Sequence, residues 1–233
     1  MKKMKIFVFP YAMGGASAYH TFKNKLESLG CEVIALNYPG HESRIMEDLL
    51  GTMQEIARDM YDQISKYLDE DYCLLGYSMG GTICYELYQL IMKNHRKMPQ
   101  HVFLLAADDP EAEPDYKNCE NMTLQRVRDI FAEMGGTPDE ILESEEMLEF
   151  LQPVVKADLC ALEKYVPTRD YKISCPVTLI RGTGEDNERC PWGWNQYLSK
   201  PCDYHEVEGE HFFMFNSDEA MRTVCGLIRK AIG

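Results

Sequence analysis

Short apolar runs alternate along the chain with longer segments in which apolar residues recur at helical spacing. The runs expected as strands, apolar enough to be buried on both faces, are residues 5–9, 31–36, 72–75, 102–106, 177–180 and 203–207. The segments expected as helices are residues 19–29, 53–68, 82–92 and 216–232, the last with a capping box from Asn216 to Glu219. This alternation predicts an α/β fold, a mostly parallel sheet flanked by helices.

One long stretch, after the fourth expected strand, breaks the alternation. Its first expected helix, residues 123–134, has an apolar face made of Leu124, Val127, Phe131 and Met134. A second helix is expected to start at Thr137 and Pro138, as cap and first helical residue, and a third at Pro153. We interpret residues 111–170 as a helical lid inserted into a single domain, residues 1–233. A purely structural helical subdomain remains an alternative.

The segment Gly76-Tyr77-Ser78-Met79-Gly80 lies between an expected strand and an expected helix. A Gly-x-Ser-x-Gly in this context is typical of the nucleophile elbow of α/β-hydrolases, which lifts the serine hydroxyl above the sheet. The alternative is a glycine-flanked serine in an ordinary strand-to-helix turn. A serine nucleophile needs a histidine as base and a carboxylate that orients the histidine, in the chain order serine, acid, histidine.

His211 follows the last expected strand, where this order places the catalytic base. The other histidines come too early, lie in segments expected at the surface, or lie within the last strand; they are His20, His41, His95, His101 and His205.

Three residues compete for the role of the acid. Asp186 follows the strand at residues 177–180 and is our first choice. Glu185 replaces it if the loop register differs by one residue, and Asp108, after the preceding strand, is the main rival.

Composition narrows the function classes. Of the 233 residues, 45% are hydrophobic and 27% charged, as in ordinary globular proteins, and the net charge is −14. This charge argues against binding to nucleic acids or to anionic membranes. The basic start is followed by an apolar run too short for a signal peptide. Nine cysteines without a C-x-x-C pair indicate reduced thiols in the cytoplasm and no metal site.

Several segments resemble the stand-alone type II thioesterases that accompany nonribosomal peptide and polyketide synthases, over nearly the whole chain. The opening at residues 9–19 is similar to the F-P-x-A-G-G-x-A-S-x-Y segment of that family, and residues 76–80 to its G-H-S-M-G elbow. Residues 135–138 match G-G-T-P, and residues 151–158 match L-P-x-x-R-A-D. Residues 38–44 and 209–213 are similar to its P-G-R-x-x-R and G-x-H-F-F segments. Departures from the family pattern are Tyr11, Met13, His41, Tyr77 and Lys156.

The resemblance implies a triad of Ser78, Asp186 and His211, with an oxyanion hole formed by the backbone amides of Ala12 and Met79. It implies hydrolysis of acyl thioesters on the phosphopantetheine arm of a carrier protein, by a monomer without a cofactor, which clears misprimed or stalled acyl groups. Candidate docking residues in the lid are Arg126, Arg128, Lys156 and Lys164. The alternatives are a carboxylesterase or lipase, a medium-chain acyl-carrier-protein or acyl-CoA thioesterase, and a non-catalytic binding protein.

Overall fold

A six-stranded parallel sheet forms the centre of the computed structural model, which describes residues 3–134 and 137–233. The strand order is β2-β1-β3-β4-β5-β6, and all five neighbouring pairs are parallel. The strands are β1 (Met4–Phe9), β2 (Cys31–Ala35), β3 (Tyr72–Tyr77), β4 (His101–Leu105), β5 (Val177–Gly182) and β6 (Asp203–Val207). The predicted α/β class is therefore confirmed.

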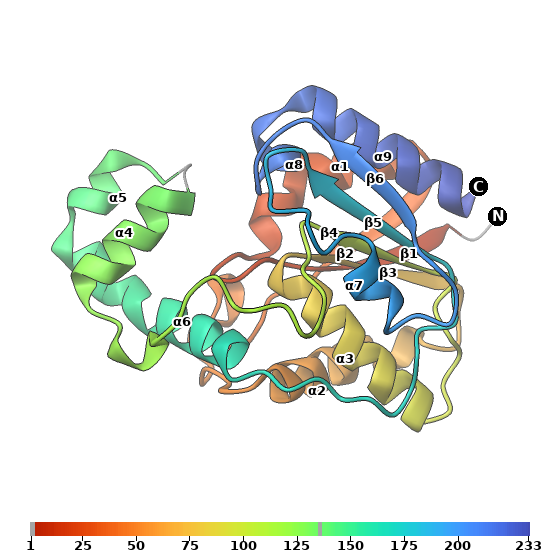
Figure 1. The fold of residues 1–233 in the computed structure, drawn as a ribbon, viewed down its shortest axis with the longest axis horizontal. Helices are drawn as coiled ribbons and strands as arrows, with labels where there is room; N and C mark the ends of the chain where they lie inside the picture. Colours follow the sequence, from red (N-terminus) through yellow and green to blue (C-terminus); the bar gives the residue numbers. More distant parts are fainter. Residues whose placement is uncertain (1–2, 135–136) are drawn as a thin grey trace.

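Helices cover both faces of the sheet (Figure 1). On one face, α1 (His20–Ser28) and α9 (Asp218–Ile232) bury their apolar sides, and on the other α2 (Met53–Ile64) and α3 (Met79–Lys93) do so. Because β3 has helices on both sides, all its residues are buried, which explains its apolar sequence. The short elements are α7 (Trp192–Asn195), α8 (Phe213–Asn216) and the 3-10 turns Ala16–Tyr19, Glu42–Arg44, Ser65–Tyr67 and Cys119–Asn121.

A helical insertion lies between β4 and β5. It consists of α4 (Leu124–Met134), α5 (Asp139–Glu143) and α6 (Glu145–Glu163). In Figure 1, α4 and α5 stand apart from the sheet, and α6 leads back toward it. No helix within residues 3–134 and 137–233 is long and apolar enough to cross a membrane.

Two predicted helix starts in the insertion are wrong. The third insertion helix begins at Glu145 rather than Pro153, because the Ser144 hydroxyl accepts a hydrogen bond from the Met147 amide and caps it. Pro153 lies inside this helix. The second begins one residue later than expected, at Asp139, without a side-chain cap. The matched pair Gly135-Gly136 lies outside the described residues.

The closing helix is capped one residue later than predicted. The Ser217 hydroxyl accepts a hydrogen bond from the Ala220 amide, whereas Asn216 ends α8. Both residues favour the cap position, so composition alone did not distinguish them.

Candidate active site

Ser78 stands at the turn between β3 and α3, with a strained backbone. Its φ is 51° and its ψ −118°, a region that residues other than glycine rarely adopt. The turn is held from both sides: the Ser78 amide donates to the Leu105 carbonyl at 2.8 Å, and the Gly81 amide donates to the Ser78 carbonyl at 2.8 Å. Strain of this kind, which costs about 1–3 kcal/mol, persists where the surroundings enforce it and is concentrated at functional sites.

The two outer positions of the elbow accept only glycine. A Cβ atom on Gly76 would collide with the Gly80 carbonyl, and one on Gly80 would collide with the Phe9 carbonyl of the neighbouring strand. The two glycines of the Gly-x-Ser-x-Gly pattern are therefore required because the backbones of β1, the end of β3 and the start of α3 approach one another closely. Ser78 itself remains half-exposed above them.

His211 lies in the loop after β6, and its partner is Glu185. Its Nδ1 is 2.8 Å from Oε1 of Glu185, whose side chain is only 5% exposed. The other carboxylate oxygen accepts a hydrogen bond from the Gly182 amide at 2.6 Å. One oxygen is thus anchored to the end of β5, and the other orients the imidazole.

Asp186, our first choice for the acid, does not pair with His211. Its side chain is exposed and accepts a hydrogen bond from the Glu188 amide at 3.0 Å, within its own turn. The carboxylate beside His211 is thus that of Glu185, our alternative, and not that of Asp186. The loop register is set by the bond from the Glu185 amide to the Gly182 carbonyl, which places residue 185 beneath the histidine.

Asp108, the rival acid, binds Arg181 instead. The buried guanidinium of Arg181 donates to Asp108 at 2.7 Å, and its Nε lies 3.5 Å from Oε2 of Glu185. Burial lowers the pKa of Arg181, but Asp108 and Glu185 outweigh this effect and raise it. Arg181 therefore stays charged and fixes Glu185. Its role was not predicted from the sequence, although an arginine within an otherwise apolar strand was a usable signal.

The serine and the histidine lie at the same edge of the sheet, since β3 and β6 are parallel and both residues follow the carboxyl ends. Among the described residues, Ser78 Oγ does not form a hydrogen bond with His211. The adjacent Tyr77 does connect the two loops, because its hydroxyl donates to the His211 carbonyl at 2.6 Å. Catalytic hydrogen bonds are often formed only when substrate binds.

The two backbone amides expected to form the oxyanion hole, those of Ala12 and Met79, are without a protein acceptor among the described residues. The Met79 amide is at the first residue of α3, where helix N–H groups have no internal partner. The next amide of the first loop, that of Met13, is already used, because it donates to Asp158 Oδ2 at 2.7 Å. The Ala12 amide thus stays available to an oxyanion.

A family model of the thioesterase domain matches residues 4–232. The chain belongs to the thioesterase domain family. Gramicidin S biosynthesis protein GrsT of Aneurinibacillus migulanus is 27% identical over 234 residues, which cover 97% of this chain and 90% of GrsT. The medium-chain S-acyl fatty acid synthase thioesterase of Rattus norvegicus is 26% identical over 219 residues, 92% of this chain and 82% of that protein.

Solved structures share the fold. The RedJ thioesterase of the prodiginine pathway in Streptomyces coelicolor superimposes with a TM-score of 0.84 at 24% identity, over 98% of this chain and 90% of RedJ. The type II thioesterase BorB of the borrelidin cluster has a TM-score of 0.85 at 21% identity, over 100% of this chain and 94% of BorB. These structures confirm the expected fold, and the match to the family model confirms the expected thioesterase family.

Two departures from the thioesterase pattern, Tyr11 and Tyr77, are in contact. Their rings meet edge to face at 6.1 Å, and Tyr11 also packs edge to face on Phe212 and Phe215, at 5.0 and 5.5 Å. Tyr77 stacks on Phe212 at 6.3 Å. The two tyrosines together thus form an aromatic contact between the first loop, the elbow and the histidine loop.

The apolar face of α4 packs within the protein. Val127 is fully buried, and its neighbour Ile130 is 1% exposed. Leu124, Phe131 and Met134 are half-buried and pack on the core that includes α6 residues. Helix–helix packing therefore accounts for Val127 in this conformation. The three half-buried residues remain candidates for contact with a substrate.

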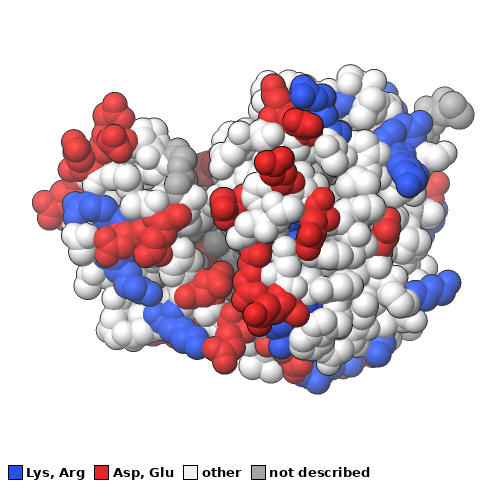
Figure 2. Space-filling model, turned by 45° about the horizontal axis from the view of Figure 1, so that its top comes forward, with Lys and Arg blue, Asp and Glu red and all other residues white. Residues whose placement is uncertain are grey.

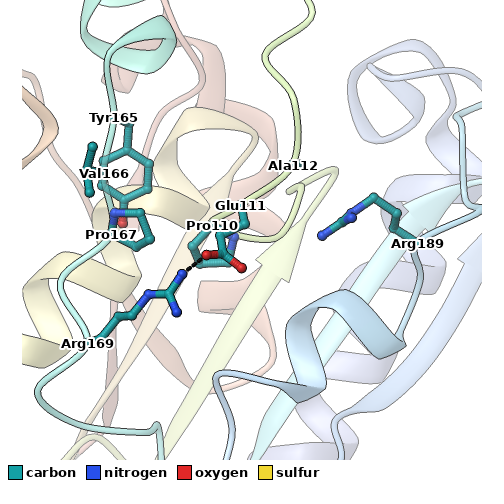
Figure 3. A pocket seen from close by; sticks show the side chains of 8 residues that line it. All are labelled: Pro110, Glu111, Ala112, Tyr165, Val166, Pro167, Arg169 and Arg189. Atoms are coloured by element: carbon teal, nitrogen blue, oxygen red, sulfur yellow. Dashed lines mark ion pairs between the residues drawn. The ribbon is translucent and has the colours of Figure 1, made fainter.

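A groove of about 500 Å³ is lined in part by Pro110, Glu111 and Ala112, which follow β4 (Figure 3). Neither Ser78 nor His211 lines it, whereas Arg169 and Arg189 do. Arg169 is paired with Glu111, as the dashed line in Figure 3 marks. Arg189 donates to both carboxylate oxygens of Asp109 at 2.8 Å. Since both guanidinium groups are paired with carboxylates, the groove has little free positive charge.

Two of the histidines that the sequence analysis set aside are buried. His101 stacks on Phe103 at 4.3 Å and lies 2.8 Å from the Thr178 hydroxyl, and burial lowers its pKa to about 4. It is therefore a neutral core residue. His41 is 4% exposed and contacts Asp158 of α6.

Proposed function

We propose that this chain is a serine thioesterase that hydrolyses acyl groups from the phosphopantetheine arm of carrier proteins. The observation that carries the proposal is the strained Ser78, at an elbow that admits only glycine at its outer positions, at the same sheet edge as the His211–Glu185 pair. Membership of the thioesterase domain family supports the choice of thioesters over oxygen esters.

In the proposed mechanism, His211 takes the proton of the Ser78 hydroxyl as the oxygen attacks the thioester carbonyl. Glu185 orients the imidazole through Nδ1 and stabilises the imidazolium that forms. The amides of Ala12 and Met79 donate to the tetrahedral oxyanion. The pantetheine thiol leaves with the proton held by His211, and water, activated by the same imidazole, then releases the acid from the acyl-serine.

The biological role that we propose is the removal of misprimed or stalled acyl groups from a nonribosomal peptide or polyketide synthase. Similarity to a gramicidin S biosynthesis protein and to a type II thioesterase of the borrelidin cluster supports this role. A second candidate is chain release from a fatty acid synthase, which the similarity to the rat medium-chain thioesterase favours. Comparing aminoacyl- or malonate-derived acyl carriers with medium-chain acyl carriers distinguishes the two.

Carrier docking must overcome a negative surface. Acidic side chains lie on both sides of the hollow between the insertion and the main body in Figure 2. Of the four candidate docking residues, Lys156 and Lys164 are both paired with Glu120. Among the described residues, Arg126 and Arg128 of α4 form hydrogen bonds to neutral acceptors only. We therefore place the carrier contact on α4, within the proposed lid of residues 111–170.

Replacement of the nucleophile tests the function. Ser78→Ala is expected to reduce hydrolysis of acyl-pantetheine thioesters by roughly 10⁴-fold or more, the usual effect of removing a triad nucleophile. The variant should keep the thermal unfolding midpoint of the wild type. Steady-state thiol release with a chromogenic disulfide measures the rate. More than a tenth of wild-type turnover in Ser78→Ala would exclude the assignment, and wild-type protein that cleaves only oxygen esters would make it a carboxylesterase.

A further inference from the structure

A buried carboxylate of the helical insertion reaches the first loop of the sheet. Asp158, in α6, is 1% exposed. Its Oδ2 accepts a hydrogen bond from the Met13 amide at 2.7 Å and lies 3.0 Å from Nε2 of His41. The three residues come from the insertion, from the loop after β1 and from the loop after β2. Asp158 is thus a contact between the insertion and the loop that presents the Ala12 amide.

The partners of His41 define the charge of this contact. Nδ1 of His41 lies 3.0 Å from the Pro39 carbonyl, and Nε2 faces the Asp158 carboxylate. A carbonyl oxygen can accept a hydrogen bond but cannot donate one, and the same is true of a carboxylate. Each ring nitrogen of His41 faces such an acceptor, so both nitrogens must donate. This arrangement fits an imidazolium at His41 that faces the Asp158 carboxylate. Hydrogen bonds to a charged acceptor are shorter and stronger than neutral ones, consistent with the 2.7 Å bond from Met13.

The loop that carries Ala12 is held on both sides of that residue. On one side, the buried Tyr38 hydroxyl donates to the Pro10 carbonyl at 2.8 Å. On the other side, the Met13 amide donates to Asp158. Met13 has a φ of 65°, in the left-handed region that a methionine avoids. A loop with this strain needs an external contact to keep its conformation.

We propose that Asp158 is a positioning residue for the oxyanion hole: from the insertion, it fixes the Met13 amide and so the direction of the adjacent Ala12 N–H. The inference rests on the proposed function, since it assumes that the Ala12 amide stabilises the oxyanion. It goes further by making α6 part of the catalytic apparatus. A displacement of α6 would remove the acceptor of Met13 and release the left-handed turn.

The test uses Asp158→Asn, which keeps the shape of the side chain but removes the negative charge. We expect kcat to fall by about tenfold or more, because loss of an oxyanion donor costs about 10²–10³ in rate and here the donor is misplaced rather than deleted. KM should change by less than about threefold, since the contact acts on the transition state rather than on substrate binding. The substrates are acyl-pantetheine thioesters and p-nitrophenyl acetate.

Met13→Gly provides the decisive second variant. Glycine adopts a positive φ without strain. With glycine at position 13, the loop should therefore keep its left-handed conformation with less help from the hydrogen bond to Asp158. Added to Asp158→Asn, Met13→Gly should restore kcat by about threefold or more, a recovery that a general packing defect would not show. If Asp158→Asn does not fold, His41→Gln replaces it in the same pair of measurements, because a neutral glutamine at this position leaves the Asp158 anion without its cation.

The expected pattern is a loss in kcat, a nearly constant KM and recovery by Met13→Gly, on both substrates. Any other pattern, such as unchanged kcat, a loss confined to KM or no recovery, overturns the proposal. A different result would contradict the proposed function: wild-type protein that hydrolyses p-nitrophenyl acetate through Ser78 but does not hydrolyse acyl-pantetheine thioesters.

Discussion

The sheet edge that carries Ser78 and the insertion that carries α4–α6 are built in different ways. At the sheet edge, short loops follow parallel strands, and backbone hydrogen bonds fix Ser78 and Glu185, such as the bond from the Ser78 amide to the Leu105 carbonyl. The described part of the insertion contains helices, which pack on one another and reach the first loop through Asp158. Positions of reacting groups are thus determined by the sheet, whereas the insertion reaches the first loop through the buried carboxylate of Asp158.

This difference suggests which substitutions affect chemistry and which affect access. A residue bonded to the strand ends should change kcat, because it holds reacting atoms. A residue on α4 should change recognition of large substrates and leave small ones unaffected. Asp158 is the exception, because it lies in the insertion but accepts a hydrogen bond from Met13 in the loop after β1. The following experiments test this division, starting with the largest expected effect.

Glu185→Gln should reduce kcat by about 10³–10⁴-fold, because an amide cannot stabilise the imidazolium and favours the wrong tautomer. The matched control is the neighbouring exposed carboxylate: Asp186→Asn should keep activity within about twofold. Steady-state kinetics on acyl-pantetheine thioesters checks both. If Asp186→Asn loses activity strongly while Glu185→Gln stays active, Asp186 is the acid, as we first predicted. If only Asp108→Asn is inactive, the acid is Asp108, which follows β4.

The positions of the strands along the chain and the choice of Ser78 and His211 as candidates were accessible from the sequence because they follow from local patterns. Apolar runs mark buried strands, and the elbow needs glycine at two positions for steric reasons that any chain must obey. The choice between Glu185 and Asp186 was not accessible, since both are carboxylates in one loop and the register depends on a hydrogen bond to Gly182. The roles of His41 and Asp158 were also missed, because they are 117 residues apart and only the tertiary fold brings them together.

The link between the two regions should depend on pH. Burial lowers the pKa of His41, but the hydrogen bond and charge of Asp158, the Pro39 carbonyl and the charge of Glu42 outweigh burial and raise it. The contribution of the imidazolium to stability is therefore complete below the ordinary histidine value of about 6.5 and is lost as pH rises through the raised pKa. The nearby hydroxyl of Tyr38 has its pKa raised well above its usual range by burial and stays neutral in this window.

As the pH rises from about 6.5 through the raised pKa of His41, we expect the free energy of unfolding to fall by up to about 2 kcal/mol. This is the usual contribution of a hydrogen bond to a charged group. Urea titrations at a series of pH values measure it. In His41→Arg the cation persists at all these pH values, so this fall should disappear. If the wild type and His41→Arg show the same pH dependence, another group is responsible and His41 is neutral.

Tyr77→Phe tests how strictly the sheet edge holds the histidine. The change removes the hydroxyl that donates to the His211 carbonyl at 2.6 Å but keeps the ring that packs on Phe212. We expect kcat to fall by about tenfold, which corresponds to about 1.4 kcal/mol, with KM nearly unchanged. Tyr11→Phe, which alters the same aromatic cluster without touching His211, is the control. Equal losses in the two variants would show that the cluster acts through packing alone.

The smallest effect is expected on the insertion. Phe131→Glu or Met134→Glu places a charge on the half-buried side of α4 and should raise KM for long-chain acyl-carrier substrates by about threefold or more, through weaker apolar contact. Turnover of p-nitrophenyl acetate, which needs no contact with α4, should stay within about twofold. Ala132→Glu adds the same charge to an exposed position of the helix and serves as the control. If Phe131→Glu reduces activity equally on both substrates, α4 is part of the packed core, and the division between a sheet edge for chemistry and an insertion for access does not hold.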